Sequence, residues 1–418
     1  MACKRSGVQI PSAPRSIMKS FLIETKELLF SQGVIAILAI IQVRVVASNL
    51  GPEIYGNIGV YLGFVGLSFR LLSSRNADLI LMNFKLTNKN FISSSLIFEL
   101  ILGFVSLLFV VFIFYIYYDF IPGYLLLYFL TRVPLNTLEV FKGVFTHIGN
   151  MKVYSFVEGS SNVIRFILVV IFVMTNPSIS SFFYALSVHQ TIVTIFTLAL
   201  LKHNYKNHER KMGLREYFIL SKSSFSKIRM DQAVGLIPTH LDVVVIGYFS
   251  NYYSAGIYRI AKKLVDPINY LIVAFSPWML NKISSNNSYQ FKNLVKRILV
   301  PLSIMIFSFY YLFGVKLINF IVGDEFNKAY TPLLILVLGY LSYFLTFWTR
   351  HYLFLNNLIH KHTSGRLINL LVFIIGSTFL ITPFSFNGIA IAIASGTIIQ
   401  KLYEYYIYFQ HKKTLNNR

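Results

Sequence analysis

Long apolar runs recur from one end of the chain to the other, and many approach the ~20 residues that a helix needs to cross a ~30 Å hydrocarbon layer. Only 13% of the 418 residues are charged and 55% are hydrophobic, whereas soluble chains carry roughly 25% charged residues. The chain therefore lacks the polar surface of a soluble fold. We predict an all-α integral membrane protein. A β-barrel is disfavoured, because its strands are alternating segments of ~10 residues.

The apolar runs and their interruptions predict about twelve membrane helices. The expected spans are 28–49, 55–73, 93–116, 123–146, 154–175, 180–201, 230–249, 254–279, 296–322, 331–355, 365–383 and 387–409. Connections rich in Lys and Arg alternate strictly with short ones that are nearly free of them, such as "YDFIPG" and "TPFSFN". This alternation predicts a multi-pass protein with both termini in the cytoplasm. The net charge of +22 lies in these loop clusters, which argues against nucleic acid as a partner.

The longest basic connection, 202–229, divides the expected helices into six and six. We interpret 18–205 as an N-lobe, 206–229 as a cytoplasmic linker with an amphipathic segment, and 230–418 as a C-lobe. Residues 1–17 are polar and unlike the rest, so we interpret them as a non-structural extension and expect translation to start at Met18. The single cysteine, Cys3, allows no internal disulfide.

The two halves share a short pattern. When 41–58 is set over 241–258 without gaps, the matches are Val43 on Val243, Val45 on Val245 and Gly56 on Gly256, with Gln42 on Asp242. Each segment ends the first helix of its half and turns into the second. The repeat predicts two parallel lobes related by a pseudo-two-fold axis along the membrane normal, around a central cavity.

Many ionisable residues fall inside the expected helices, where each costs ~2.5–3.5 kcal/mol at a helix centre unless it faces a partner or a wet cavity. The basic candidates for the lining of an anion-binding cavity are Arg44, Arg132, Lys142, Arg165, Arg259, Lys262 and Arg350. The acidic candidates for counterions or cation coupling are Asp242, Glu139, Glu158 and Asp266. Arginine matches phosphate oxygens in a bidentate manner and lysine acts as a point charge. The basic surplus therefore predicts an anionic substrate and argues against organic cations.

Each of these candidates also has an ordinary structural reading. Arg44 either contacts an anion in the cavity or pairs with a neighbouring acid or extends to the interface. Lys142 lies three residues after Glu139, which allows a local ion pair beside Arg132. Arg165 shares a helix face with Glu158. Residues 259, 262, 263 and 266 form one polar stripe that faces either the cavity or the water interface.

Asp242 lies near the middle of the seventh expected helix, in "PTHLDVVVIGYF". It either neutralises a basic residue of the cavity or binds the H⁺ or Na⁺ that drives transport. We expect its replacement by asparagine to impair export. His189, in "YALSVHQTIV", is either a satisfied polar contact between helices or a proton relay.

Four segments resemble the Wzx-type polysaccharide flippases, of the superfamily that also holds multidrug extruders and lipid II flippases. They are "LGPEIYGNIGVY" (50–61), "LDVVVIGYFSNYYSAGIYRIAKKLVDPI" (241–268), "VGDEFNKAYTPLLILVLG" (322–339) and "NGIAIAIASGTII" (387–399). Together with the length and the helix count, the resemblance covers nearly the whole chain. The sixth expected helix departs from the family's small-residue pattern.

The resemblance implies a monomeric flippase in the bacterial inner membrane. Its substrate would be an undecaprenyl-pyrophosphate-linked oligosaccharide for O-antigen, capsule or a related polymer, and it would need no cofactor beyond an H⁺ or Na⁺ coupling ion. A polysaccharide polymerase and a chain-length regulator are the partners that it implies. Two alternatives stay open. One is a multidrug or metabolite exporter of the same superfamily. The other is a membrane polysaccharide polymerase or ligase, which the short periplasmic loops disfavour.

Overall fold

The computed structural model describes residues 14–72, 92–118, 120–147, 151–204, 213–284 and 295–416. These residues form helices joined by short turns, and no strand occurs among them. The N-terminal helices are α1 (Pro14–Leu72), α3 (Ile92–Tyr118), α4 (Gly123–Leu135), α5 (Leu138–His147), α6 (Met151–Thr175) and α7 (Ile179–Asn204). The C-terminal helices are α8 (Leu214–Phe249), α9 (Tyr252–Ser284), α11 (Val300–Val322), α12 (Tyr330–Thr346), α13 (Trp348–Leu355) and α14 (Ile359–Asn416).

Each of the twelve expected membrane helices corresponds to a helical segment, although two pairs are continuous. The helix α1 bends at Gly51, whose φ of 73° is in the left-handed region that suits glycine, immediately before Pro52. The helix α14 bends at Ser385, two residues after Pro383. Conversely, the fourth expected helix is divided into α4 and α5, and the tenth into α12 and α13. By length and composition, eight described helices could cross a membrane, and α1 and α14 each hold two of the expected spans.

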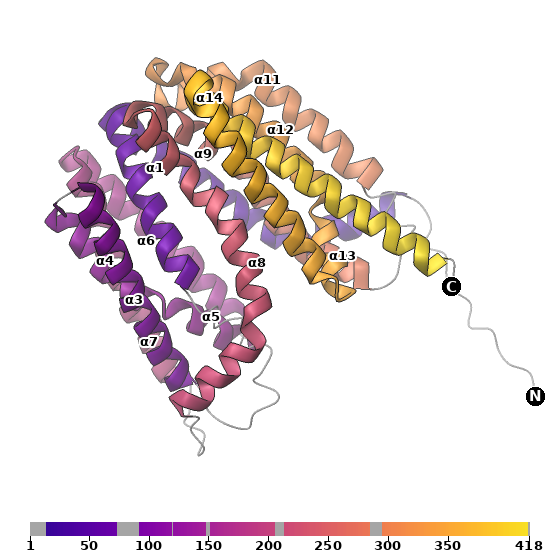
Figure 1. Cartoon of the computed structure of the whole chain (residues 1–418), viewed down its shortest axis with the longest axis horizontal. Helices are drawn as coiled ribbons and strands as arrows, with labels where there is room; N and C mark the ends of the chain where they lie inside the picture. Colours follow the sequence, from indigo (N-terminus) through magenta and orange to yellow (C-terminus); the bar gives the residue numbers. More distant parts are fainter. Residues whose placement is uncertain are drawn as a thin grey trace, which may run out of the picture.

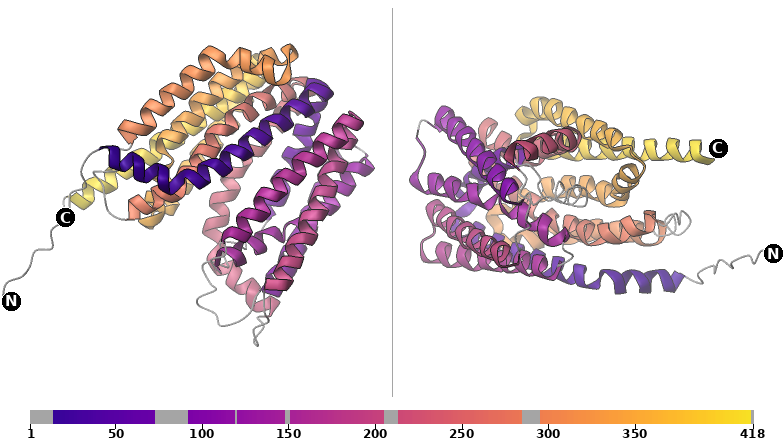
Figure 2. Two further views of the ribbon diagram at one scale, coloured as in Figure 1. Left: turned by 180° about the vertical axis from the view of Figure 1, so that it is seen from behind. Right: turned by 90° about the horizontal axis from the view of Figure 1, so that it is seen from below.

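The helices form two lobes that meet at one end and diverge at the other. Figure 1 shows the lobes close together near the turn between α8 and α9, and far apart at the C-terminal ends of α7 and α14; Figure 2 shows the same arrangement from behind. Three described connections that are poor in Lys and Arg lie together where the lobes meet. The Ser385 hydroxyl donates to that of Ser250 at 3.1 Å, and Pro52, which follows Gly51, faces Gly256. The prediction of a two-lobe, all-α membrane fold is confirmed.

Glycines allow the lobes to approach at that end. The second half of α1 packs on α8 and α9 through a face with glycine every three or four residues, as membrane helices often do: Gly56, Gly59, Gly63 and Gly66. A Cβ atom on Gly56 would collide with the carbonyl oxygen of Tyr252, and one on Gly256 would collide with that of Pro52. The contact is therefore reciprocal, and its partners are 200 residues apart. This is the offset at which the two halves of the sequence match.

The start of α8 lies against the N-lobe. Tyr217 is fully buried, and its ring packs edge-on against Phe98 of α3 at a centroid distance of 5.7 Å. Residues 206–212 of the expected linker lie outside the described residues, and 214–229 form the first part of α8. Residues 1–13 of the expected extension also lie outside them, and α1 begins at Pro14.

Candidate substrate cavity

A cavity of about 330 Å³ lies between the N-lobe helices and α9. We call it the N-lobe cavity. Four cations line it: Arg132 from α4, Arg165 from α6, and Arg259 and Lys263 from α9. His189 and Gln190 of α7 complete its polar wall. Because the four cations come from three different helices, only the folded chain brings their positive charges together.

Two of these arginines, Arg132 and Arg165, each have a hydrogen-bond donor without an acceptor among the described residues. The Nε atoms of Arg132 and Arg165 are buried and have no hydrogen-bond partner in the described part of the chain. No described carboxylate lies within 4.0 Å of the guanidinium of either residue. Both side chains are half-buried. Arginine cannot be deprotonated in a protein, and a charge that is partly removed from water is stabilised by an anionic partner. Both side chains are therefore prepared to receive an anion.

The two cations of α9, Arg259 and Lys263, have polar partners, unlike the Nε atoms of Arg132 and Arg165. Arg259 is 8% exposed, donates from Nη1 to the carbonyl oxygen of Tyr55 at 2.7 Å, and lies 4.2 Å above the centre of the Tyr55 ring. Lys263 pairs with Asp266 at 2.8 Å. Asp266 thus offsets one of the four positive charges, and the lining keeps a positive excess. Such a cavity suits a polyanion and repels an organic cation.

A second cavity, of about 250 Å³, lies within the C-lobe between α8, α9, α12 and α14. We call it the C-lobe cavity. Asp242, fully buried, lies in its wall beside Lys262, and Tyr258 donates to Asp242 Oδ2 at 2.9 Å. Gln42 lines the N-lobe cavity as Asp242 lines this one, so the two cavities are related by the same offset of 200 residues. Their charge differs, because the Asp242 carboxylate is paired with Lys262.

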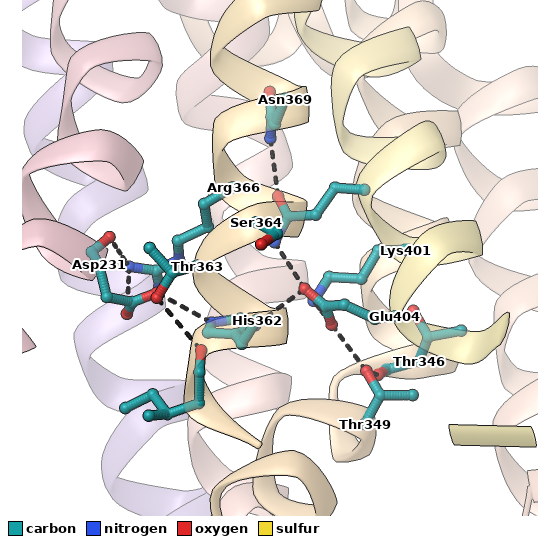
Figure 3. Close-up of polar contacts among 12 residues, drawn as sticks. Asp231, Thr346, Thr349, His362, Thr363, Ser364, Arg366, Asn369, Lys401 and Glu404 are labelled. Atoms are coloured by element: carbon teal, nitrogen blue, oxygen red, sulfur yellow. Dashed lines mark hydrogen bonds and ion pairs between the residues drawn. The ribbon is translucent and has the colours of Figure 1, made fainter. Parts of the chain in front are cut away.

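A buried polar cluster that the sequence analysis does not identify lies beside the C-lobe cavity (Figure 3). We call its five charged or titratable members the C-lobe network: Asp231, His362, Arg366, Lys401 and Glu404. They connect α8 with both halves of α14. The i,i+3 spacing of Lys401 and Glu404 in the last helix is a signal of this network in the sequence. His362 lies beside Lys361 in a segment whose composition resembles a basic loop, and Arg366 lies at the start of the expected helix 365–383, where a basic residue is typical of the membrane interface.

The candidates from the sequence are distributed over several environments. Arg132, Arg165 and Arg259 line the N-lobe cavity, and Asp242 and Lys262 line the C-lobe cavity. The stripe on α9 therefore faces two cavities, because successive residues of a helix are ~100° apart around its axis. His189 is satisfied between helices, since its Nε2 lies 3.0 Å from the hydroxyl oxygen of Ser161 on α6.

The remaining candidates line neither cavity. Arg44 is exposed in the last two turns before the Gly51 bend, and its guanidinium lies over the ring of Phe320 at 5.3 Å. The neighbouring residues Val43, Val46 and Ala47 occupy the buried face of α1 instead. Lys142 and Glu158 are exposed, while Glu139 and Arg350 are half-buried on α5 and α13. Asp266 reaches the N-lobe cavity only through Lys263.

The two lobes, the bent membrane helices and the cavities lined by charged residues define a multi-pass membrane transporter. Solved structures share this fold. The lipid II flippase MurJ in an inward closed conformation is 16% identical, with a TM-score of 0.74 over 91% of this chain and 87% of that chain. An inward-facing multidrug resistance MATE family transporter of the MOP superfamily is 13% identical, with a TM-score of 0.70 over 93% and 99%.

A transporter of the MOP superfamily from Pyrococcus furiosus is 14% identical, with a TM-score of 0.60 over 95% of this chain and 96% of that chain. A comparison with curated proteins found no match. The sequence profile of one family matches residues 25–279, more than half of the chain. The chain belongs to this family, which is described as polysaccharide biosynthesis protein. The expected resemblance to polysaccharide flippases is thereby confirmed, and the family and its structural neighbours are transporters rather than enzymes.

Proposed function

We propose that the protein is a flippase that moves undecaprenyl-pyrophosphate-linked oligosaccharide repeat units across the bacterial inner membrane, for O-antigen, capsule or a related surface polymer. The observation that carries the proposal is the N-lobe cavity, in which the guanidinium groups of Arg132 and Arg165 have no carboxylate partner among the described residues. Membership of a polysaccharide biosynthesis family supports a lipid-linked saccharide as the substrate.

The cavity can lower the barrier to moving a pyrophosphate through the membrane. Hydrogen bonds between an ionised donor and a phosphate oxygen are about twice as strong as neutral ones, and arginine can form two in parallel. Among the described residues nothing accepts a hydrogen bond from the Nε atoms of Arg132 and Arg165, whereas Arg259 is fixed by Tyr55. We infer that the two free arginines bind the phosphate oxygens while Arg259 and Lys263 contribute positive potential. The sugar and lipid parts would remain in wetter or more apolar surroundings.

Alternating access would follow from rocking of one lobe against the other. The basic connections are expected on the cytoplasmic side, which is the side where the lobes diverge and where the C-terminus lies. On that assignment the structure is an inward-facing state that receives substrate from the cytoplasmic leaflet. Closure there, with opening near the Gly56–Gly256 contact, would deliver the pyrophosphate to the periplasmic side.

The first experiment is gene deletion in a host that has no second flippase, followed by measurement of surface polysaccharide and of the lipid-linked oligosaccharide pool. Loss of polymer with accumulation of single repeat units on undecaprenyl pyrophosphate is expected. Wild type should restore the polymer, and Arg132→Ala and Arg165→Ala should not, at equal protein levels. Arg44→Ala is the matched control, because Arg44 is an arginine on the exposed face of α1.

Unchanged polymer in the deletion strain would refute the proposal and would favour export of a drug or metabolite instead. Lost polymer without accumulation of lipid-linked units would also refute it, because the block would then lie outside the flipping step. Full activity of both Arg132→Ala and Arg165→Ala would show that transport does not depend on these two arginines of the N-lobe cavity.

A further inference from the structure

The two imidazole nitrogens of His362 face two different carboxylates, that of Glu404 at short distance and that of Asp231 at a longer one (Figure 3). The ring is 4% exposed, in the first turn of α14. Its Nδ1 lies 2.9 Å from Glu404 Oε1. Its Nε2 is buried without a hydrogen-bond partner in the described part of the chain, and it lies 3.9 Å from Asp231 Oδ1. That distance is too long for a hydrogen bond.

The partners of Glu404 determine where the proton of the neutral ring resides. Besides His362, the Glu404 carboxylate accepts hydrogen bonds from Thr349 Oγ1 at 2.8 Å, Gln400 Nε2 at 2.7 Å and Lys401 Nζ at 2.7 Å. A carboxylate that accepts from several donors is ionised and has no proton to give. The short contact with His362 therefore requires Nδ1 to be the donor. In the neutral ring, Nε2 then carries only a lone pair.

The group that faces this lone pair is also an acceptor. Asp231 Oδ2 lies 3.0 Å from Arg366 Nη1, and Asp231 Oδ1 accepts from Thr363 Oγ1 at 3.2 Å. Asp231 is thus held as a carboxylate whose Oδ1 points toward Nε2. Two buried acceptors that face each other without a hydrogen between them are electrostatically unfavourable. A proton on Nε2 converts this arrangement into an ion pair.

The charges around His362 favour a proton over a metal ion. Asp231 is paired with Arg366, and Glu404 with Lys401, so the network is neutral while His362 is neutral. On α13, His351 is close enough to interact electrostatically with His362, and Arg350 with Arg366; the His351 Nε2 is engaged with the Ser276 hydroxyl at 2.9 Å. Both carboxylates already have cationic partners that would repel a metal. No group of three metal-binding residues occurs in the part of the chain that the structure describes.

We propose that the lone pair of His362 Nε2, facing Asp231, is a proton-binding site of the C-lobe whose occupancy tightens the contact between α8 and α14. Proton binding forms the Nε2–H bond and gives the imidazole a positive charge, and no other bond breaks. Closing the 3.9 Å separation to hydrogen-bond distance requires a shift of about 1 Å between Asp231 and His362. Because α8 also packs against the N-lobe through α1, this shift acts on the contact between the lobes.

The role of this site in transport rests on the proposed function, but the proton site itself does not. Its test therefore uses the purified full chain without substrate. The protein is labelled with ¹⁵N-histidine in lipid nanodiscs and its spectra are followed from about pH 9 to about pH 5, the range in which histidines titrate. His362→Gln identifies the His362 signals among the nine histidines. Asp231→Asn tests the partner, and His351→Gln is the matched control.

We expect His362 to be neutral with the proton on Nδ1 at high pH, and to gain a proton at Nε2 on acidification. Asp231→Asn should change the pH of that transition, and His351→Gln should leave it in place. A ring that stays neutral over the whole range would overturn the proposal and would indicate a water that donates to both acceptors. A transition that is unchanged in Asp231→Asn would overturn it as well.

A second measurement follows the contact between the helices. Cys3 is the only cysteine, so spin labels can be placed on a Cys3→Ser background at Met230→Cys and His360→Cys, both on exposed positions of α8 and α14. Acidification should shorten the mean label distance in the parent and not in His362→Gln. An equal change in both proteins would refute the coupling. Failure of either measurement leaves the N-lobe cavity experiment unaffected, so the two proposals can fail separately.

Discussion

Lys262 Nζ lies 2.5 Å from Asp242 Oδ2 in the wall of the C-lobe cavity, and Tyr258 binds the same oxygen. Asp242 is therefore the anionic half of a buried ion pair. This arrangement supports the counterion interpretation of Asp242, while its part in ion coupling remains a hypothesis. The pair comes from two helices, α8 and α9, so it also fixes their relative rotation.

Asp242→Asn should lower stability and impair export, because it leaves the Lys262 charge without its partner. Breaking a buried pair costs ~3–5 kcal/mol, and we expect less here because the Lys262 side chain is 20% exposed. Thermal unfolding in detergent and export at equal protein levels measure both effects. The double variant Asp242→Asn, Lys262→Gln should recover part of the lost stability. Additive losses in the double variant would contradict a direct pairing.

Gly56→Ala and Gly256→Ala should each destabilise the protein and hinder transport, because the new methyl group meets backbone that cannot rotate away. Overpacking of this kind costs ~1–3 kcal/mol. Gly159→Ala is the control: a Cβ there has nothing within 4 Å, and alanine favours a helix by about 1 kcal/mol over glycine. Melting temperatures of the three variants measure the effect. Equal behaviour of Gly56→Ala and Gly159→Ala would disprove close packing of the lobes.

Arg259→Lys should weaken the contact between the lobes although it keeps the charge. A lysine cannot both donate to the Tyr55 carbonyl and lie flat over its ring, and the two interactions together contribute ~1–3 kcal/mol. The arginine uses the ring and the backbone of Tyr55, so Tyr55→Phe should be nearly neutral, whereas Tyr55→Leu should resemble Arg259→Lys. Stability measurements on the three variants decide this. A strong loss in Tyr55→Phe would show that the hydroxyl matters instead.

Arg132→Gln and Arg165→Gln should each weaken binding of a polyprenyl pyrophosphate probe to the purified protein. A hydrogen bond to a charged group contributes ~1.5–3 kcal/mol, which corresponds to about 10-fold to 150-fold in affinity. The matched control, Arg44→Gln, removes an exposed arginine and should leave the affinity unchanged. Binding isotherms in detergent provide the measurement. If the control loses as much affinity as the cavity variants, the binding site lies elsewhere.

The fold could be predicted from the sequence because each membrane helix has its own apolar run and its own charged or uncharged flank. Even the offset of 200 residues was visible, and Gly56 and Gly256 meet at it. The sequence does not show whether two successive membrane helices are joined by a turn or by a bend within one continuous helix, as in α1 and α14. At the bend of α1, for example, Gly51 and Pro52 are typical of both. Hydropathy gives the position of a residue along the membrane normal, and it does not give the direction in which its side chain points.

That missing direction explains why the candidates from the sequence lie in different environments in the structure. Arg44 and Arg165 are both arginines within apolar helices, yet one is exposed and the other lines a cavity. The difference arises from the rotation of each helix, which tertiary packing sets. His362 was missed for another reason. Its segment is as basic as a cytoplasmic loop. Its carboxylate partners are also distant in sequence, since Asp231 lies on α8 and Glu404 lies 42 residues further along α14.

The reciprocal contact of Gly56 and Gly256 also has a mechanical consequence. The backbones of α1 and α9 touch there without intervening side chains, so the contact can act as a narrow pivot, or fulcrum, near one end of two long helices. From residue 256 to the end of α9 at Ser284, a rise of ~1.5 Å per residue gives an arm of about 42 Å. A rotation of about 10° at the fulcrum would move the far end of that arm by about 7 Å. Small changes in side-chain contacts beside the fulcrum are thereby converted into a displacement larger than a phosphate group.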